Sequence, residues 1–314
     1  MGKEREIIAN FSKKKVLLIG DSILDVYVYG TAIGKSLETP TIVAKEHSRK
    51  VSFGGASLVA RNLLELGASV NYITLIGNDE DSDNYKGLKH ENLHMHFVVD
   101  PSRSTTIKKR FWVDGYKLLQ FDTLDNRDLE SNLIFKVLKI AKKLIRSCDV
   151  VIISDYRHGL MTSRLIRDLK KLLIDSKKPV FVDSQISHRE SNHMLYKDLF
   201  MILLNEVEAK SIDEKFSLSF DVLSDVLGKS NICIKLGENG SICKINGKII
   251  RSRASSIKVV DTCGAGDAFI AALALGDLNE IEPSLRIANC WAGLSVQVQG
   301  PEPPKKKELL KIYA

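Results

Sequence analysis

From about residue 129 onward, the chain alternates between segments with helical hydrophobic spacing and short segments that are almost wholly apolar. Helical spacing runs through Leu129, Leu133, Val137, Ile140 and Leu144. The short apolar segments, each of the length of a buried strand, are residues 150–153, 179–182, 200–204 and 231–236. Helices that alternate with buried strands are typical of a mostly parallel sheet covered on both faces. This alternation therefore predicts an α/β protein with three layers, αβα.

The first half of the chain carries two different patterns. Residues 16–20 form an apolar run that ends in Gly20-Asp21, which predicts a buried strand with polar groups at its carboxyl end. Open α/β sheets bind ligands at such strand ends. Residues 41–45 and 108–113 instead alternate apolar and polar side chains, as half-exposed antiparallel strands do.

These patterns together predict the organisation of the chain. We expect a single domain over residues 1–314, because no linker of low complexity and no internal repeat divides it. The half-exposed strands are expected to belong to two insertions, at about residues 26–52 and 96–122, that form a small separate β-sheet.

The basic surplus of the chain is concentrated in one region. The whole chain has a net charge of +7, whereas residues 136–178 alone carry twelve basic side chains against four acidic ones. These basic side chains lie mainly on the polar faces of two predicted amphipathic helices, without the interleaved aromatic residues on which bases stack. We interpret them as solvated faces and expect no nucleic-acid partner.

Neither a membrane span nor an export signal is predicted. No apolar run approaches the roughly 20 residues of a bilayer-spanning helix, and the charged N-terminus lacks the apolar stretch of a secretory signal. The five cysteines are widely spaced and form no Cys-x-x-Cys pair, so no zinc site is predicted. We therefore expect a cytoplasmic protein with reduced thiols and no membrane partner.

Residues 261–269, Asp-Thr-Cys-Gly-Ala-Gly-Asp-Ala-Phe, lead into an apolar helical pattern. At the start of a helix, the free N–H groups of Gly264, Ala265 and Gly266 suit a phosphate or a developing anion. Asp267 in this position suits a base that takes a proton from an attacking hydroxyl while the N–H groups hold the transferring phosphoryl group. The alternative is that Asp267 only caps the helix and that the glycines form a tight turn.

This segment resembles the C-terminal signature of the PfkB/ribokinase family of sugar kinases, whose Asp is the catalytic base. Residues 53–67, with Gly54-Gly55 ahead of a predicted helix, resemble the N-terminal sugar-binding motif of the same family. No Walker A sequence occurs, so a P-loop kinase is not an alternative. The resemblance implies a ribokinase-like fold in which the small β-sheet is a lid, with ATP as phosphoryl donor. It also implies the catalytic residues Asp267, Gly264, Ala265 and Gly266.

The same resemblance implies a metal ion. Asn205-Glu206-Val207-Glu208 resembles the Asn-x-x-Glu motif of the family, which helps to hold Mg²⁺ and its waters near the phosphates of the nucleotide. Taken alone, Asn followed by Glu is also a common helix start. We therefore expect Asn205 at the nucleotide site and Glu208 bound to Mg²⁺ through water.

Two further segments resemble the nucleotide site of the family. Gly237 and Gly240 stand in a strand-to-turn segment beside the nucleotide, where the family usually has Thr or Ser in place of Lys235. Asn289 resembles a residue in the segment that flanks the adenine. These positions imply that Gly237, Gly240 and Asn289 contact the nucleotide.

One branch of the family matches best. Residues 20–25, 38–40, 105–110, 120–122 and 154–159 resemble, in order, the heptose-7-phosphate kinases of lipopolysaccharide-precursor synthesis. This resemblance implies transfer of the γ-phosphoryl group of ATP to O1 of D-glycero-D-manno-heptose 7-phosphate. Bifunctional relatives add a nucleotidyltransferase domain, and this sequence ends at Ala314, so we expect any nucleotidyl transfer to be done elsewhere.

A substrate that already carries a phosphate requires basic side chains. Lys108 and Arg110 are the candidates, since Arg grips a phosphate with two hydrogen bonds and Lys acts as a point charge. The alternative for both is an exposed basic strand. Asp25, at a strand end, is the candidate acceptor for sugar hydroxyls. The remaining predicted substrate-binding residues are Gly54, Gly55 and Asp155.

Departures from the family pattern keep other functions open. Leu58 stands where the sugar-site motif usually has Asn, and an apolar side chain cannot hydrogen-bond a hydroxyl. Residues 183–185, Asp-Ser-Gln, stand where the heptose kinases tend to have Asp-Pro-Lys. The alternatives are a kinase for an unphosphorylated sugar or nucleoside, and a non-catalytic regulatory protein of the same fold that binds ATP and sugar. The expected partners are a small sugar or sugar phosphate, ATP and a second subunit bound through the lid.

Overall fold

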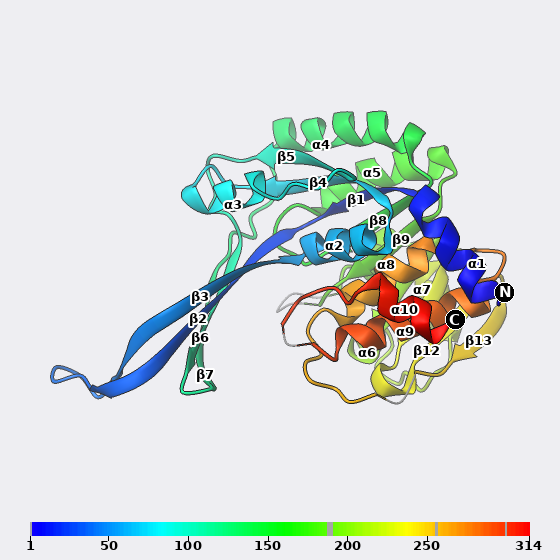
Figure 1. Cartoon of the computed structure of the whole chain (residues 1–314). Coiled ribbons are helices and arrows are strands. Elements are labelled where there is room, and N and C mark those ends of the chain that lie inside the picture. The colour runs from blue at the N-terminus through cyan, green and yellow to red at the C-terminus, as the bar shows by residue number, and fades with distance from the viewer. Residues whose placement is uncertain (1, 187–190, 255–256, 299) are drawn as a thin grey trace.

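Two β-sheets organise the chain, as Figure 1 shows. The computed structural model describes residues 2–186, 191–254, 257–298 and 300–314. The large sheet contains β1 (Lys15–Gly20), β4 (Ser69–Ile76), β5 (Leu93–Val99), β8 (Val150–Asp155), β9 (Val180–Ser184), β10 (Met201–Asn205), β11 (Asn231–Lys235), β12 (Ser241–Ile245) and β13 (Lys248–Ser252). The small sheet contains β2 (Ser22–Lys35), β3 (Ile42–Gly55), β6 (Ile107–Val113) and β7 (Tyr116–Thr123).

Helices connect most of the strands. The α-helices are α1 (Lys3–Asn10), α2 (Ala56–Leu66), α3 (Asp83–Lys86), α4 (Ser131–Leu144), α5 (Ser163–Ser176), α6 (Glu206–Ile212), α7 (Asp221–Leu227), α8 (Ala265–Leu275), α9 (Ile281–Ser295) and α10 (Lys306–Ile312). Short 3-10 turns are η1 (Phe11–Lys13), η2 (Glu80–Ser82), η3 (Ile145–Ser147), η4 (His193–Tyr196) and η5 (Gly237–Asn239).

The large sheet has the order β13-β12-β11-β10-β9-β8-β1-β4-β5. Its strands pair in parallel from β11 to β5, and β12 and β13 add an antiparallel edge. Because these parallel strands run in one direction, their carboxyl ends meet along a single edge of the sheet, where ligands bind in open α/β sheets. The predicted mostly parallel sheet is confirmed.

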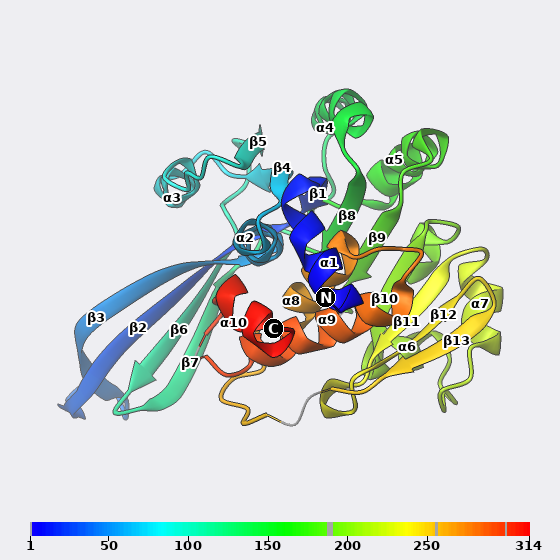
Figure 2. The same cartoon turned by 45° about the vertical axis from the view of Figure 1, so that its right-hand side comes forward.

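Helices cover both faces of this sheet. Val16 and Leu18 of β1 face a core shared with α1, α2, α8, α9 and α10, whereas Leu17 and Ile19 face a core shared with α4, α5, α6 and α7. Successive side chains of a strand point to opposite faces, so a strand buried on both faces contains an uninterrupted apolar run. Figure 2 shows the two helical layers on either side of the strands. The predicted three-layer αβα arrangement is confirmed.

The small sheet, in the order β3-β2-β6-β7, projects from the body as a long arm (Figure 1). Its outer pairs, β2 with β3 and β6 with β7, are antiparallel, as predicted. The central pair, β2 with β6, is parallel, so the antiparallel prediction is wrong there. The chain passes through α2, β4 and β5 of the body before it returns as β6, and it therefore leaves the body in the same direction as β2.

The predicted limits of the second insertion also need correction. Residues 96–99 belong to β5, which pairs with β4 at the edge of the large sheet. An edge strand has one half-open face, and it therefore shows the same apolar and polar alternation as a strand of the small sheet. The first pair of small-sheet strands extends over residues 22–35 and 42–55, on both sides of the expected limits.

Among the described residues, none of the helices combines the length and the apolar character that crossing a membrane requires.

Candidate active site

The segment predicted to hold the transferring phosphoryl group opens α8. Gly264 has a φ of 84°, a left-handed conformation that favours glycine, and Asp267 is the third residue of the helix. The first N–H groups of a helix have no partner within it, although the Ala265 N–H donates to the Thr262 carbonyl at 3.3 Å. The helix start therefore presents backbone donors next to a carboxylate.

Leu58, the apolar departure in the sugar-site motif, lies against this helix start. A Cβ at Gly264 would lie 2.5 Å from Leu58 Cδ2, and Leu58 is buried. Its side chain therefore fills the space beside Gly264 and packs in the interior, where it offers no polar group to a ligand.

Asp267 is held by a tyrosine. The Tyr156 hydroxyl donates a hydrogen bond to Asp267 Oδ1. Burial raises the pKa of Asp267 to about 7, and the charge of Asp183 adds to this, whereas the hydrogen bond from Tyr156 and the charge of Lys235 lower it. A carboxyl group that titrates near neutral pH is suited to general-base chemistry. In the sequence, Tyr156 stands out only as part of residues 154–159, which resemble the heptose kinases.

Asp21, directly after β1, organises the loop that carries Tyr156. Its carboxylate oxygens accept hydrogen bonds from the backbone N–H groups of Tyr156 at 3.0 Å, His158 at 3.2 Å and Leu160 at 3.0 Å. Asp21 is 2% exposed, so this carboxylate acts inside the protein. Its signal in the sequence was the Gly20-Asp21 strand end, to which no individual role was assigned.

Three of the predicted sugar-site residues meet on the small sheet. Asp25 Oδ1 accepts a hydrogen bond from Arg110 Nη1, and the two side chains form an ion pair. A Cβ on Gly54 would overlap the Asp25 carboxylate at Oδ2, so glycine leaves the room that this carboxylate occupies. The Arg110 guanidinium also lies over the ring of Tyr27, 5.3 Å from its centroid.

Gly55 allows β3 to pass closely beside the end of β1. Its φ is +59°, and a Cβ there would lie 2.6 Å from the backbone oxygen of Asp21. The Ala56 N–H donates to that same oxygen at 2.9 Å. Gly55 therefore joins β3, the strand that also carries Gly54, to the carboxyl edge of the large sheet.

Lys108 lies on the same face of the small sheet as Asp25 and Arg110. It pairs with Asp25 in the β2–β6 register, and residues two apart in a strand share a face. Burial and the nearby charge of Lys108 lower the pKa of His158 to about 4, so this imidazole is neutral at pH 7. Among the described residues, His158 Nε2 is buried without a hydrogen-bond partner. His158 belongs to residues 154–159, one of the segments that resemble the heptose kinases, and its position after a strand made it a candidate to line the sugar site.

Asn205 and Glu208 form a capping box at the start of α6. The Asn205 side chain accepts from the Glu208 N–H at 2.8 Å, and Glu208 Oε2 accepts from the Asn205 N–H at 2.7 Å. The helix-start interpretation of this motif is therefore confirmed. Burial, and to a smaller extent the charge of Asp183, raises the pKa of Glu208 to about 7. Because an opposite charge favours the ionised form of a carboxyl group, a cation bound beside Glu208 would stabilise its carboxylate.

Lys235 and Asp183 form an ion pair with Nζ and Oδ2 2.6 Å apart. Lys235 ends β11 and Asp183 lies near the end of β9, with β10 between them. Lys235 stands where the family usually has Thr or Ser, whereas Asp183 keeps the Asp of the Asp-Pro-Lys segment of the heptose kinases. Neither residue was predicted to belong to the site.

The other predicted nucleotide contacts differ from one another. Gly237, with a φ of +56°, has open space on its side-chain side. A Cβ on Gly240 would overlap the Ser252 carbonyl oxygen, and the Asn289 amide donates to Ser241 Oγ at 3.0 Å and Ser252 Oγ at 2.9 Å. Close packing at Gly240 and the hydrogen bonds of Asn289 therefore give both residues a structural role, and their contact with the nucleotide stays a prediction.

Asp155 does not fit its predicted contact with the substrate. Its side chain is fully buried, and Oδ2 accepts hydrogen bonds from Ser184 Oγ, Asn192 Nδ2 and Tyr196 Oη at 2.7–2.9 Å. The strand end directs this carboxylate into the interior, where it connects β8 to the segment after β9. We therefore do not retain Asp155 in the site.

Among the described residues, no group of three or more His, Cys, Asp and Glu side chains has the arrangement of a metal site. A site in which Glu208 holds Mg²⁺ through water does not require such a cluster, because Mg²⁺ in proteins usually keeps several of its waters.

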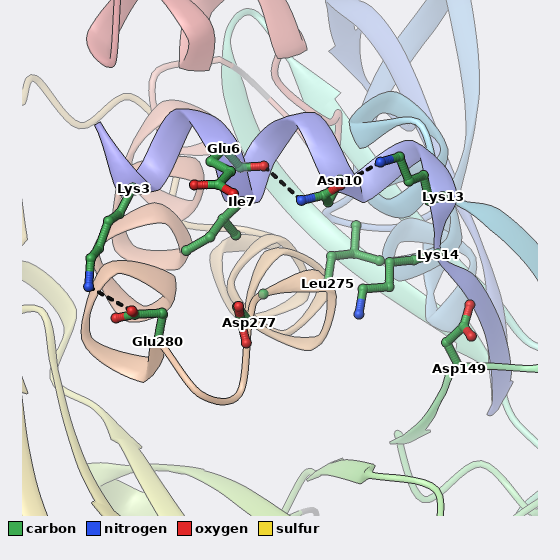
Figure 3. A pocket seen from close by; sticks show the side chains of 11 residues that line it. Lys3, Glu6, Ile7, Asn10, Lys13, Lys14, Asp149, Leu275, Asp277 and Glu280 are labelled. Carbon is green, nitrogen blue, oxygen red and sulfur yellow. Dashed lines mark hydrogen bonds and ion pairs between the residues drawn. The ribbon is translucent and has the colours of Figure 1, made fainter. Parts of the chain in front are cut away.

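A surface hollow beside α1 lies away from these residues (Figure 3). Its lining includes Lys14 and Asp149, which precede β1 and β8, and Gly276, which follows α8. It therefore lies at the amino ends of the strands, opposite Asp267. Lys3 and Glu280 form an ion pair across it at 2.6 Å.

Comparison with known proteins decides the family. Residues 13–308 match the profile of the pfkB family of carbohydrate kinases. The chain belongs to this family.

It is 30% identical to the bifunctional protein HldE of Bradyrhizobium diazoefficiens over 92% of this chain and 60% of that protein. It is 28% identical to HldE of Caulobacter vibrioides over 95% of this chain and 63% of that protein. The chain thus spans about 60% of the length of these curated relatives.

Solved structures of a ribokinase and of a phosphofructokinase resemble the chain over nearly its whole length. Arabidopsis thaliana ribokinase, in complex with ribose and ATP, has a TM-score of 0.72 at 21% identity and covers 95% of this chain and 98% of its own. The tetrameric inhibited form of Escherichia coli phosphofructokinase-2 has a TM-score of 0.76 at 17% identity, with 96% and 98% covered. The predicted ribokinase-like fold is confirmed. The predicted enzyme class, a phosphotransferase with an alcohol group as acceptor, is that of the family and is confirmed.

Proposed function

We propose that the protein transfers the γ-phosphoryl group of ATP to a hydroxyl of a sugar phosphate, with O1 of D-glycero-D-manno-heptose 7-phosphate as the acceptor. The observation that carries this proposal is the position of Asp267. It lies in the first turn of α8, and the charges of Asp25 on the sugar side and of Lys235 on the nucleotide side both act on it. A base between the two substrates is what a direct transfer requires.

The chemical step follows from this position. Asp267 accepts the proton of the sugar hydroxyl, the hydroxyl oxygen forms a bond to the γ-phosphorus, and the bond from that phosphorus to the β-phosphate oxygen breaks. The products are a phosphorylated sugar and ADP. The N–H groups at Gly264 and Gly266 donate to the transferring group as negative charge spreads over its oxygens. The hydrogen bond from Tyr156 keeps the carboxylate oriented until the sugar hydroxyl replaces it.

The nucleotide is expected along the carboxyl ends of β10 and β11. Gly237, with open space around it, is a candidate contact there, and Glu208 would hold Mg²⁺ through water. The metal ion supplies neutralisation of charge on the β- and γ-phosphates when it is bound. The use of ATP favours the cytoplasm as the place of the reaction.

The acceptor is expected on the small sheet. Asp25, held by Arg110, accepts hydrogen bonds from sugar hydroxyls, and Lys108 on the same face attracts the phosphate that the sugar already carries. His158 Nε2, which is buried and has no hydrogen-bond partner in the part of the chain that the structure describes, is a further polar contact for the sugar phosphate.

Replacement of Lys108 tests the phosphorylated substrate. We expect Lys108→Ala to raise KM for heptose 7-phosphate about 10- to 100-fold, because a hydrogen bond to a charged group contributes about 1.5–3 kcal/mol. KM for the unphosphorylated heptose should not change. Lys109→Ala is the matched control, since Lys109 pairs with Val26 on the opposite face. Steady-state ADP release measures each KM. Equal effects of Lys108→Ala on both sugars would contradict the assignment.

We also propose a homodimer through the small sheet. Leu119 and Phe121 are more than half exposed and lie on the face opposite Asp25, next to Phe111. Exposed apolar patches of this kind mark interaction surfaces. Light scattering is expected to give the mass of two chains for the native protein and of one chain for Phe121→Asp. A monomeric native protein would contradict the dimer.

A further inference from the structure

Lys235 reaches across one strand to form its ion pair. β10 lies between β11, which Lys235 ends, and β9, which contains Asp183. The ammonium Nζ lies 2.6 Å from Asp183 Oδ2, and the two side chains are 16% and 14% exposed. The pair is therefore largely buried but still open to a ligand at the carboxyl edge of the sheet.

The ion pair lies against the first turn of α8. A Cβ on Gly266 would lie 3.4 Å from Lys235 Nζ and 3.8 Å from Asp183 Oδ2. The N-terminus of a helix carries the positive end of its dipole, which disfavours a cation. A lysine placed here therefore needs carboxylates or a bound anion beside it.

Carboxylates surround this ammonium. The charges of Asp183, Glu208 and Asp267 all act on Lys235, so one cation lies among three acidic groups. A polyanion that approaches the first turn of α8 is repelled by these carboxylates and attracted by the ammonium and the backbone N–H groups. Lys235 is thus placed to decide whether a chain of phosphates can bind here.

We propose that Lys235 is a direct ligand of the triphosphate of ATP, and that Asp183 holds its ammonium in place in the free protein. This inference rests on the proposed function and names the side chain that binds its nucleotide. On binding, the ammonium donates to phosphate oxygens, which form strong charge-assisted hydrogen bonds. The same contact stabilises the negative charge that develops during transfer, so it acts on both affinity and turnover.

The competing role for Lys235 is purely structural, as an ion pair that fastens β11 to β9. In that case Lys235 and Asp183 are equivalent, because loss of either one breaks the same buried ion pair. If Lys235 instead binds the triphosphate, the two residues have opposite roles. Replacement of Lys235 removes a side chain that binds ATP, whereas removal of the Asp183 charge leaves the Lys235 ammonium free to bind phosphate.

The test compares nucleotides that differ in phosphate content. Titration calorimetry measures the affinity of the whole chain for ATP with Mg²⁺ and for adenosine. We expect Lys235→Met to lower the affinity for ATP about 10- to 100-fold, as for loss of a hydrogen bond to a charged group. The affinity for adenosine should stay within two-fold of the native value, because adenosine has no phosphate. Lys235→Arg is expected to restore most of the affinity for ATP. Asp183→Asn is expected to bind ATP as tightly as the native protein or more tightly.

Two controls keep the result interpretable. Lys244→Met removes another partly buried lysine of the same sheet, whose Nζ donates to Ser224 Oγ at 2.9 Å, and it should change neither affinity. The double variant Lys235→Met with Asp183→Asn removes both charges of the ion pair, and it should fold and still bind ATP weakly. Equal loss of ATP and adenosine affinity in Lys235→Met, or native affinity for ATP in a folded double variant, would overturn the proposal.

The readout separates this inference from the proposed function. A native protein that binds ATP but phosphorylates no sugar overturns the proposed function, while the contrast between ATP and adenosine still decides the role of Lys235. A native protein that does not bind ATP overturns both.

Discussion

Replacement of Asp267 by Asn is expected to lower kcat by about 10²- to 10⁴-fold, the range that a general base contributes. The amide keeps the size of the side chain but cannot take the proton of the sugar hydroxyl. ATP affinity should remain, because the Gly264 and Gly266 N–H groups and Lys235 are unchanged. The measurement is the rate of sugar-dependent ADP release at saturating substrates, together with ATP binding by calorimetry. Native turnover in a folded Asp267→Asn variant that binds ATP would show that Asp267 is not the base.

The pH profile of the native enzyme supplies a second readout of the same assignment. Burial and the charges of Asp183 and Asp25 raise the pKa of Asp267 to about 7, against the lowering effects of Tyr156 and Lys235. Since the base acts in its charged form, kcat/KM should be full above pH 7 and fall as the pH drops through this value. Tyr156→Phe removes a hydrogen bond that favours the charged form, so its acid limb should move to higher pH. If the acid limb of the Tyr156→Phe variant lies at the same pH as that of the native protein, Tyr156 does not influence the pKa of the base.

Replacement of Gly54 by Ala is expected to impair use of the sugar substrate. The added Cβ would overlap Asp25 Oδ2, so the carboxylate must leave its place and its ion pair with Arg110. We expect kcat/KM for the sugar to fall about 10- to 100-fold, because hydrogen bonds to a charged group contribute about 1.5–3 kcal/mol. The fold should be kept, since the atom that must move is the end of a flexible side chain.

Gly87→Ala is the matched control for this glycine. Gly87 has a φ of −80°, and its added Cβ would lie 3.4 Å from the nearest heavy atom, the Asn84 carbonyl oxygen. Steady-state kinetics and thermal unfolding should match those of the native protein. If Gly54→Ala also keeps its native kcat/KM for the sugar, the carboxylate of Asp25 does not hold the substrate.

Local patterns in the sequence predicted the large sheet well. Residues 150–153 and 232–234 are apolar because their strands are buried on both faces, and this pattern depends on few distant contacts. The direction of β6 depends instead on where the chain re-enters the small sheet after more than fifty intervening residues. Alternation within residues 108–113 carries no information about that direction. The same limit applies to residues 96–99, whose edge strand has the pattern of a small-sheet strand.

The candidate site was predictable where a motif fixes the backbone, and not where side chains meet across strands. Gly264 and Asp267 occupy a helix start that the glycine-rich sequence indicates directly. The contact of Tyr156 with Asp267 and that of Lys235 with Asp183 join residues more than fifty positions apart. Asp155 shows the converse limit, because a carboxylate at a strand end can point to the ligand edge or, as here, into the interior.

Above all, we expect this chain to phosphorylate a sugar phosphate with ATP as the phosphoryl donor. The most direct measurement is ADP release by the native protein with ATP and a panel of sugars, with each product identified by mass and by phosphorus NMR. We predict ADP release that depends on heptose 7-phosphate, with one equivalent of a heptose bisphosphate phosphorylated at O1 for each ADP. ATP binding without ADP release for any sugar of the panel would contradict the account.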